Sequence, residues 1–209
     1  MGIYGEVKKA VAQLTALGLP QGPHITRYSM YERLRSVGRR LQSRGGRVLS
    51  ISGSEELVAT LGLTPSELVA ADYPTHNMLA LGFPDSSFDY VVSDQVLEHV
   101  EGNPQRAIDE CRRVLRPGGV AVHTTCFVNP VHGMPKDFWR FSQDALALLH
   151  EGWSEILEVG GWGNPEVWIV ARCGLRFVGV PHAEWHPLHR LAVKNDPLWP
   201  IVTWVVARK

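Results

Sequence analysis

The sequence lacks three features that would assign it to a class at once. No apolar run approaches the roughly 20 residues of a membrane-spanning helix, and the longest candidate, residues 201–207, suits a buried strand. The three cysteines, Cys111, Cys126 and Cys173, lie far apart without a CxxC pattern, so we expect neither disulfides nor a metal site. The first residues contain no hydrophobic signal-peptide segment. We therefore expect a cytoplasmic protein with no membrane partner.

The chain also lacks net charge, because 21 Lys and Arg balance 21 Asp and Glu. The charges are nevertheless unevenly distributed. Residues 1–47 carry nine basic side chains and two acids, whereas residues 48–111 carry eleven acids and a single base, Arg106. A basic segment can bind nucleic acid, but few aromatic side chains lie among these bases. We interpret it as a solvated helix face and do not expect nucleic acid as a partner.

Its 209 residues, 44% of them hydrophobic, are enough for one core, and their pattern predicts an α/β protein. Helices are expected at residues 4–18, 28–44, 104–115 and 143–149 and in a segment ending at residue 61. Strands are expected at residues 47–52, 68–71, 88–93, 120–125, 156–159 and 201–207, although Thr64–Glu67 also resembles a helix start. Gly45 and Gly46 are expected to cap the second helix. Residues 161–199 remain unassigned.

This alternation predicts a mostly parallel sheet with helices on both faces. We divide the chain into a helical N-terminal cap, residues 1–46, and an α/β domain, residues 47–209. The Ser52-Gly53-Ser54 turn joins a strand to a helix, where backbone N–H groups can bind a phosphate or nucleotide. It contains one glycine, so a plain turn is the alternative. Ser52 and Glu55 have the spacing of a capping box.

The most informative stretch runs from residue 77 to residue 119. It contains, in order, LGFPDSSFD at residues 81–89, VLEHV at 96–100 and RVLRPGG at 113–119. These three blocks resemble the class I S-adenosylmethionine-dependent methyltransferases in both order and spacing. The resemblance covers about residues 47–160. It implies a Rossmann-like fold with a mostly parallel seven-stranded sheet, here abridged between the second and fourth strands, and S-adenosylmethionine as the cofactor.

The resemblance also implies which residues bind that cofactor. In chain order, they are Ser52, Gly53 and Ser54 along the methionine part, Asp72 at the ribose, Asn77 and Met78 at the adenine, and Ser93 beside the methyl group. The first motif departs from the family pattern, because Ser50 replaces its acid and Ser52, Ser54 and Glu56 replace its glycines. A side chain at a close-approach position can obstruct a ligand. A methyltransferase fold that has lost catalysis is therefore an alternative.

A long loop after the 120–125 strand supplies the candidates for acceptor binding. Asp137, Trp139 and Arg140 are the predicted substrate residues, because a guanidinium binds carboxylate or phosphate and an indole excludes water. The alternative is that Arg140 simply pairs with Asp137. The candidate catalytic residues are His132 first, then Asp94 and His99, since histidine suits general-base catalysis near neutral pH. The spacing of the histidines between residues 182 and 189 does not predict a metal site.

The predicted function is transfer of a methyl group from S-adenosylmethionine to oxygen or nitrogen of a small-molecule or sugar-like acceptor. One alternative is a catalytically inactive binding protein of the same fold. A second is an RNA or protein methyltransferase that uses the basic N-terminal segment. The tryptophan-rich C-terminal third leaves a homodimer open.

Overall fold

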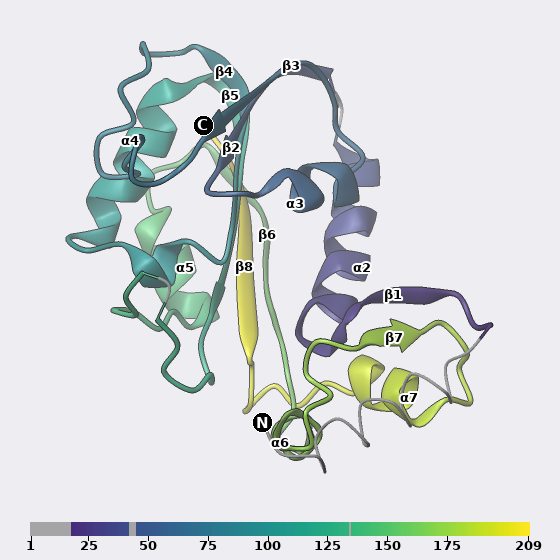
Figure 1. The fold of residues 1–209 in the computed structure, drawn as a ribbon. Helices are drawn as coiled ribbons and strands as arrows, with labels where there is room; N and C mark the ends of the chain where they lie inside the picture. The colour runs from purple at the N-terminus through teal and green to yellow at the C-terminus, as the bar shows by residue number, and fades with distance from the viewer. Residues whose placement is uncertain (1–17, 42–44, 134) are drawn as a thin grey trace.

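The computed structural model describes residues 18–41, 45–133 and 135–209, so the helix predicted at residues 4–18 lies outside the described residues. A six-stranded sheet runs through the molecule (Figure 1). Its order is β3 (Thr64–Ala71), β2 (Gly45–Ile51), β4 (Phe88–Asp94), β5 (Leu115–Cys126), β8 (Val202–Arg208) and β6 (Glu155–Trp162). The first four strands are parallel, and β8 is antiparallel to both of its neighbours.

Helices cover both faces of this sheet (Figure 1). On one face lie α4 (Pro104–Val114) and α5 (Gln143–Leu149); on the other lie α2 (Ile25–Arg40) and α3 (Glu55–Thr60). Alternate residues of each central strand enter opposite cores: Val48 packs with α2 and α3, whereas Leu49 packs with α4. This burial on both faces explains why the central strands are apolar without alternation. The predicted α/β class with a mostly parallel sheet is confirmed.

The sheet has six strands among the described residues, where the family resemblance implied seven. Residues 72–87 between β3 and β4 form no helix or strand, apart from one isolated bridge between Asn77 and Ala80. The abridgement expected between the second and fourth strands therefore lies here. The stretch is too short for a crossover helix and a further strand, so β3 is the edge strand of the sheet.

Local predictions near the N-terminal half need correction. The helix predicted from residue 28 begins at Ile25 and ends at Arg40, and Gly45 and Gly46 lie in β2 rather than capping it. Thr64–Glu67 is strand, since this segment pairs with β2. The capping box of Ser52 and Glu55 does not form, because Ser54 is the N-cap residue and makes no side-chain cap bond.

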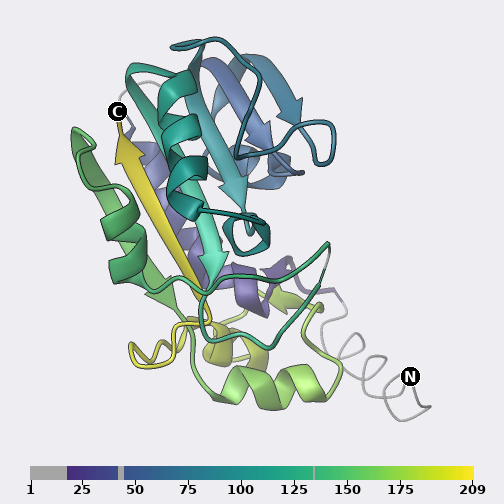
Figure 2. The same ribbon diagram turned by 90° about the vertical axis from the view of Figure 1, so that its left-hand side faces the viewer.

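The unassigned C-terminal stretch contains α6 (Glu166–Arg172), β7 (Gly179–Pro181) and α7 (Pro187–Val193). Strand β7 pairs with β1 (Gln21–His24), so the C-terminal third and the start of α2 lie side by side (Figures 1 and 2). Helix α2 shares one hydrophobic core with α6, α7 and the sheet. No helix among the described residues is long and apolar enough to cross a membrane.

Candidate functional site

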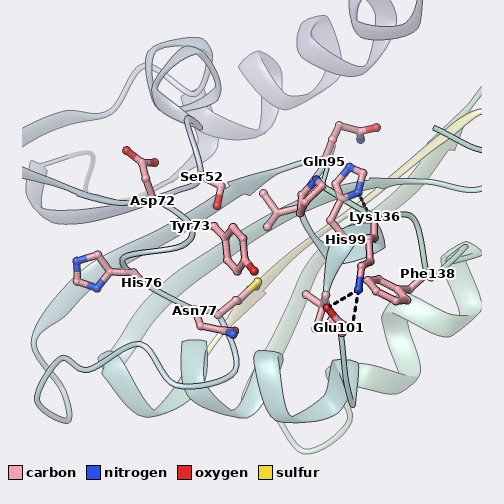
Figure 3. A pocket seen from close by; sticks show the side chains of 14 residues that line it. Ser52, Asp72, Tyr73, His76, Asn77, Gln95, His99, Glu101, Lys136 and Phe138 are labelled. Carbon is pink, nitrogen blue, oxygen red and sulfur yellow. Dashed lines mark hydrogen bonds and ion pairs between the residues drawn. The ribbon is translucent and has the colours of Figure 1, made fainter. Parts of the chain in front are cut away.

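A cavity of about 750 Å³ opens where the parallel strands β2, β3 and β4 end (Figure 3). This edge is where open α/β sheets bind ligands. The volume lies within the roughly 300–1,000 Å³ typical of small-molecule sites. The residues that line it include Ser52, Asp72, Tyr73, His76, Asn77, Met78, Gln95, His99, Lys136 and Phe138.

The turn after β2 presents its backbone at this cavity. Ser52 and Gly53 both have positive φ, 52° and 76°. The Gly53 N–H donates to Oδ1 of Asp72 over 3.1 Å, and a Cβ built on Gly53 would meet no atom within 4 Å. The exposed Asp72 carboxylate thus stands at the cavity with Oδ2 unpartnered among the described residues.

Ser54 points away from the cavity. Its side chain is buried, its Oγ donates to the Ile51 carbonyl over 2.5 Å, and Asp94 N–H donates to it over 2.8 Å. The hydroxyl therefore joins the turn after β2 to the end of β4, a link that the family's usual glycine could not make. Ser50 donates to Oε1 of Glu55 over 2.8 Å, so a carboxylate from α3 lies beside the position where the family has its acid.

Asp94 and Ser93 are held inside the protein. The Asp94 carboxylate accepts hydrogen bonds from Tyr31 and Thr124 and pairs with Arg27, whose Nε lies 3.4 Å away. Burial and Asp94 together raise the pKa of Tyr31. Ser93 is fully buried with its Oγ 2.7 Å from Nδ1 of His123. Neither residue lines the cavity, so this position favours a structural role over proton transfer.

His99 lines the acceptor side of the cavity (Figure 3). Its Nδ1 lies 2.5 Å from the carbonyl oxygen of Lys136, and a carbonyl oxygen can only accept. This contact assigns the proton to Nδ1 and leaves the Nε2 lone pair available as a base. The ammonium of Lys136 in turn pairs with Glu101 across the cavity rim over 3.1 Å.

His132 stands behind His99, with ring centroids 5.1 Å apart, and it does not line the cavity. Its Nδ1 is 3.2 Å from Oδ2 of Asp137, and its backbone N–H donates to the same oxygen over 2.7 Å. Asp137 also accepts two hydrogen bonds from Arg140. Those bonds hold the pKa of Asp137 well below its ordinary value.

The other two predicted substrate residues, Arg140 and Trp139, already make hydrogen bonds to neighbouring groups of the protein. Arg140 donates to Asp137 and to the carbonyls of Asn129 and Pro130, so the pairing considered as the alternative is present. Trp139 donates from Nε1 to the Val100 carbonyl over 2.9 Å and remains 39% exposed. Of the loop's aromatic residues before α5, Phe138 is the one that lines the cavity.

Sequence reasoning missed several residues of the site. Tyr73 and His76 line the cavity because the shortened segment after Asp72 wraps directly over it. Their only signal was proximity to Asp72. Lys136 and Glu101 lie at the rim, and Glu98 is completely buried beneath it. No local pattern distinguishes these charges from solvated surface residues.

The strand order and the cavity at the carboxyl edge of the sheet define a Rossmann-like fold of the class I methyltransferase type. Solved structures agree: a putative methyltransferase from Bacillus halodurans has a TM-score of 0.53 at 16% identity, covering 85% of this chain and 99% of its own. An S-adenosylmethionine-dependent methyltransferase from Archaeoglobus fulgidus has a TM-score of 0.51 at 15% identity, covering 86% and 94%. At these identities the likeness establishes the fold.

The sequence comparisons point in the same direction over part of the chain. Residues 36–123, fewer than half of the 209, match the model of the methyltransferase domain. A 2-methyl-6-phytyl-1,4-hydroquinone methyltransferase from Synechocystis is 33% identical over 111 residues, 47% of this chain and 33% of the relative. An uncharacterised transposon protein from Streptomyces fradiae is 39% identical over 77 residues, 37% of this chain and 22% of the relative. The chain thus matches a third or less of these relatives' lengths.

The chain therefore has the fold of the class I S-adenosylmethionine-dependent methyltransferases and resembles them in sequence over residues 36–123, and S-adenosylmethionine is the cofactor that this resemblance indicates. The site fits that cofactor at three points. Asp72 offers an exposed carboxylate for ribose hydroxyls, Met78 supplies a buried apolar wall, and the space beside Gly53 is open. The serine that replaces a glycine at position 54 does not obstruct the cavity, because its side chain faces the protein interior.

Proposed function

We propose that this protein transfers a methyl group from S-adenosylmethionine to an oxygen or nitrogen atom of a small-molecule or sugar-like acceptor, in the cytoplasm. The observation that carries the proposal is the cavity itself. It has an exposed carboxylate, Asp72, at one end and a histidine with a free lone pair, His99, at the other. In this proposal the cofactor-binding residues and the general base therefore line the same cavity.

Each residue has a distinct task in this proposal. Asp72 binds the ribose of the cofactor, and Met78 and Asn77 border its adenine. When bound, the cofactor supplies the methyl group from its sulfonium centre. His99 accepts the acceptor's proton at Nε2 while the Lys136 carbonyl holds its Nδ1–H. Phe138 excludes water from the acceptor side. His99 takes precedence over His132 because His99 reaches the cavity.

Calorimetric titration with S-adenosylmethionine and S-adenosylhomocysteine tests the cofactor site first. We expect micromolar binding to the unmodified chain and at least a tenfold loss in Asp72→Ala, because a ribose hydrogen-bond acceptor is removed. Asp85→Ala, at an exposed carboxylate paired with Arg113 outside the cavity, is the matched control and should bind normally. Absence of binding at millimolar ligand would refute the proposal.

His99→Gln then separates binding from catalysis. This variant should bind both ligands normally and lose methyl transfer to an acceptor found by screening, because glutamine cannot take up the proton. His132→Gln serves as the comparison. Equal loss in both variants would contradict the assignment of the base to His99.

The inactive binding protein is the second candidate, and one observation favours it. Glu55 and Glu56 place two carboxylates in the first turn of α3, beside the turn that would contact the carboxylate of the cofactor. Binding of a nucleoside without turnover of any acceptor would support this alternative.

Action on RNA gains no support from the structure. Five described bases of the N-terminal segment are already paired: Arg27 with Asp94, Arg33 and Arg40 with Glu158, Arg35 with Glu32, and Arg47 with Glu67. These pairs reduce the charge available to phosphates. A salt-dependent shift of labelled RNA would overturn this interpretation.

A further inference from the structure

A second group of ligand-type side chains lies behind His99, outside the cavity lining. It consists of Glu98 in η1 (Leu97–His99), Cys126 at the end of β5, and His132 in the following loop. One ligand atom from each lies within 4.8 Å of the others, and Oε1 of Glu98 is 3.9 Å from Nε2 of His132. The 3-10 helix at residues 97–99 thus brings an oxygen donor to the sulfur and nitrogen donors that lie at the end of β5 and in the loop after it.

Glu98 is the least expected member of this cluster. Its side chain has no solvent exposure, and burial raises its pKa. Oε2 accepts a hydrogen bond from Thr125 over 2.9 Å, but Oε1 has no hydrogen-bond partner among the described residues. An unsatisfied buried carboxylate oxygen is costly, and the groups that the structure places beside the Glu98 carboxylate are the thiol of Cys126 and the imidazole of His132.

His132 is oriented toward the same point. The Asp137 carboxylate lies 3.2 Å from Nδ1 of His132, Nδ2 of Asn129 lies 3.0 Å from the same nitrogen, and the opposite ring nitrogen, Nε2, lies on the side of Glu98. Arg140 fixes Asp137 in turn. A carboxylate that hydrogen-bonds the far nitrogen of a histidine is the usual second layer around metal-binding histidines.

We propose that Glu98, Cys126 and His132 form a three-ligand site for a divalent transition metal of the zinc type, with one coordination position open. Sulfur and imidazole donors select such an ion over magnesium or calcium. Ligands around tetrahedral zinc stand roughly 3.5 Å apart, so the ligand atoms, which lie within 4.8 Å of one another, must approach by up to about 1.3 Å. His132 belongs to a loop and its side chain is partly exposed, whereas Glu98 and Cys126 are buried in the core.

Metal binding requires the thiolate of Cys126. Without a metal, burial and the neighbouring Glu98 raise the pKa of the Cys126 thiol to about 12. A bound cation deprotonates a coordinating thiol, so uptake releases a proton and strengthens as pH rises. The proposal does not depend on methyl transfer.

Cobalt(II) is the probe, because cobalt–thiolate coordination gives a charge-transfer absorption band in the near ultraviolet. The full chain, reduced and stripped of metal, is titrated with Co²⁺ and then with Zn²⁺. We expect one equivalent of Co²⁺ to bind with that band, and Zn²⁺ to displace it. Cys126→Ser should abolish the band, and Asp137→Asn should weaken Co²⁺ binding about tenfold while keeping it.

Two matched controls locate the site. Cys173→Ser removes a thiol outside the proposed site, and His99→Gln removes the imidazole beside it. Both variants should keep the cobalt–thiolate absorption band. Thermal unfolding without metal checks that each variant folds; if Cys126→Ser does not, Glu98→Gln must weaken Co²⁺ binding at least tenfold. No thiolate band in the unmodified chain, or a band that survives in Cys126→Ser, would overturn the proposal. Binding of S-adenosylhomocysteine by the same variants tests the proposed function separately.

Discussion

The two halves of the carboxyl edge of the sheet are stabilised by different features. The half after β2 and β3 relies on backbone: positive φ at Ser52 and Gly53, a free space, and the exposed Asp72. The half after β4 and β5 relies on charged side chains held inside the protein behind the cavity lining, such as Asp94 and Asp137. Changes in the first half should alter ligand binding at little cost in stability, whereas changes in the second should alter stability itself.

The sharpest test of this contrast removes one member of the Asp137–Arg140 pair. The Asp137 side chain is 3% exposed, so Arg140→Ala leaves a nearly inaccessible carboxylate without its cation. We expect the free energy of unfolding to fall by about 3 kcal/mol, measured by urea denaturation at neutral pH. Arg116→Ala, which breaks an exposed pair with Asp89, is the control and should cost less than about 1 kcal/mol.

A pH titration extends the comparison to histidines buried against β5. Burial lowers the pKa of His150 from 6.5 to about 4, and burial also lowers the pKa of His123 well below 6.5. Between pH 6.5 and about 4 the unfolded chain therefore binds more protons than the folded one, and stability must fall as pH falls. We expect His150 alone to account for a loss of about 2–3 kcal/mol across this range. His150→Phe should flatten the curve; an unchanged slope would contradict the assignment.

Ser54 is the exception that connects the two halves, since its buried hydroxyl bonds both Ile51 and Asp94. Ser54→Ala leaves the Asp94 N–H and the Ile51 carbonyl without that partner. We expect a loss of about 1–2 kcal/mol in unfolding free energy by thermal denaturation. Ser86→Ala, at an exposed loop serine, is the control. A stabilised Ser54→Ala protein would show that the hydroxyl makes no net contribution.

The smallest effect on stability is expected at Gly53. A Cβ there meets nothing, so the only cost of Gly53→Ala is its positive φ, about 1 kcal/mol. Gly38→Ala should lose more stability, because its Cβ would lie 2.0 Å from the Leu61 carbonyl oxygen in the core. Melting temperatures of both variants check this; equal losses would mean that the turn after β2 is as tightly packed as the core.

Much of the fold follows from local pattern. Central strands such as β4 are short apolar runs, and α4 is an amphipathic segment that begins after the Asn103 cap and a proline. Each of these signals involves only neighbouring residues, so it can be recognised in the sequence without knowledge of the fold. The segment Thr64–Glu67 does not carry such a signal: a proline and a glutamate resemble a helix start, and only pairing with β2 makes them strand.

The candidate site divides in the same way. Asp72 and Asn77 were predicted and do line the cavity, because their positions relative to a strand end can be read along the chain. Ser54 and Ser93 were predicted alongside them but face the interior. The choice between facing a ligand and bonding a neighbouring strand depends on partners distant in sequence, so it is invisible to local reasoning.

The sequence by itself determined the resemblance to methyltransferases over residues 36–123, the α/β class and the shortened stretch between β3 and β4, and it placed a carboxylate, Asp72, at the end of β3. Each of these rests on spacing along a single segment. Only the tertiary structure decided that His99 reaches the cavity while His132 joins Glu98 and Cys126 behind it. The reason is physical: the burial and orientation of these side chains are set by contacts between β4, β5 and a loop, which no single segment encodes.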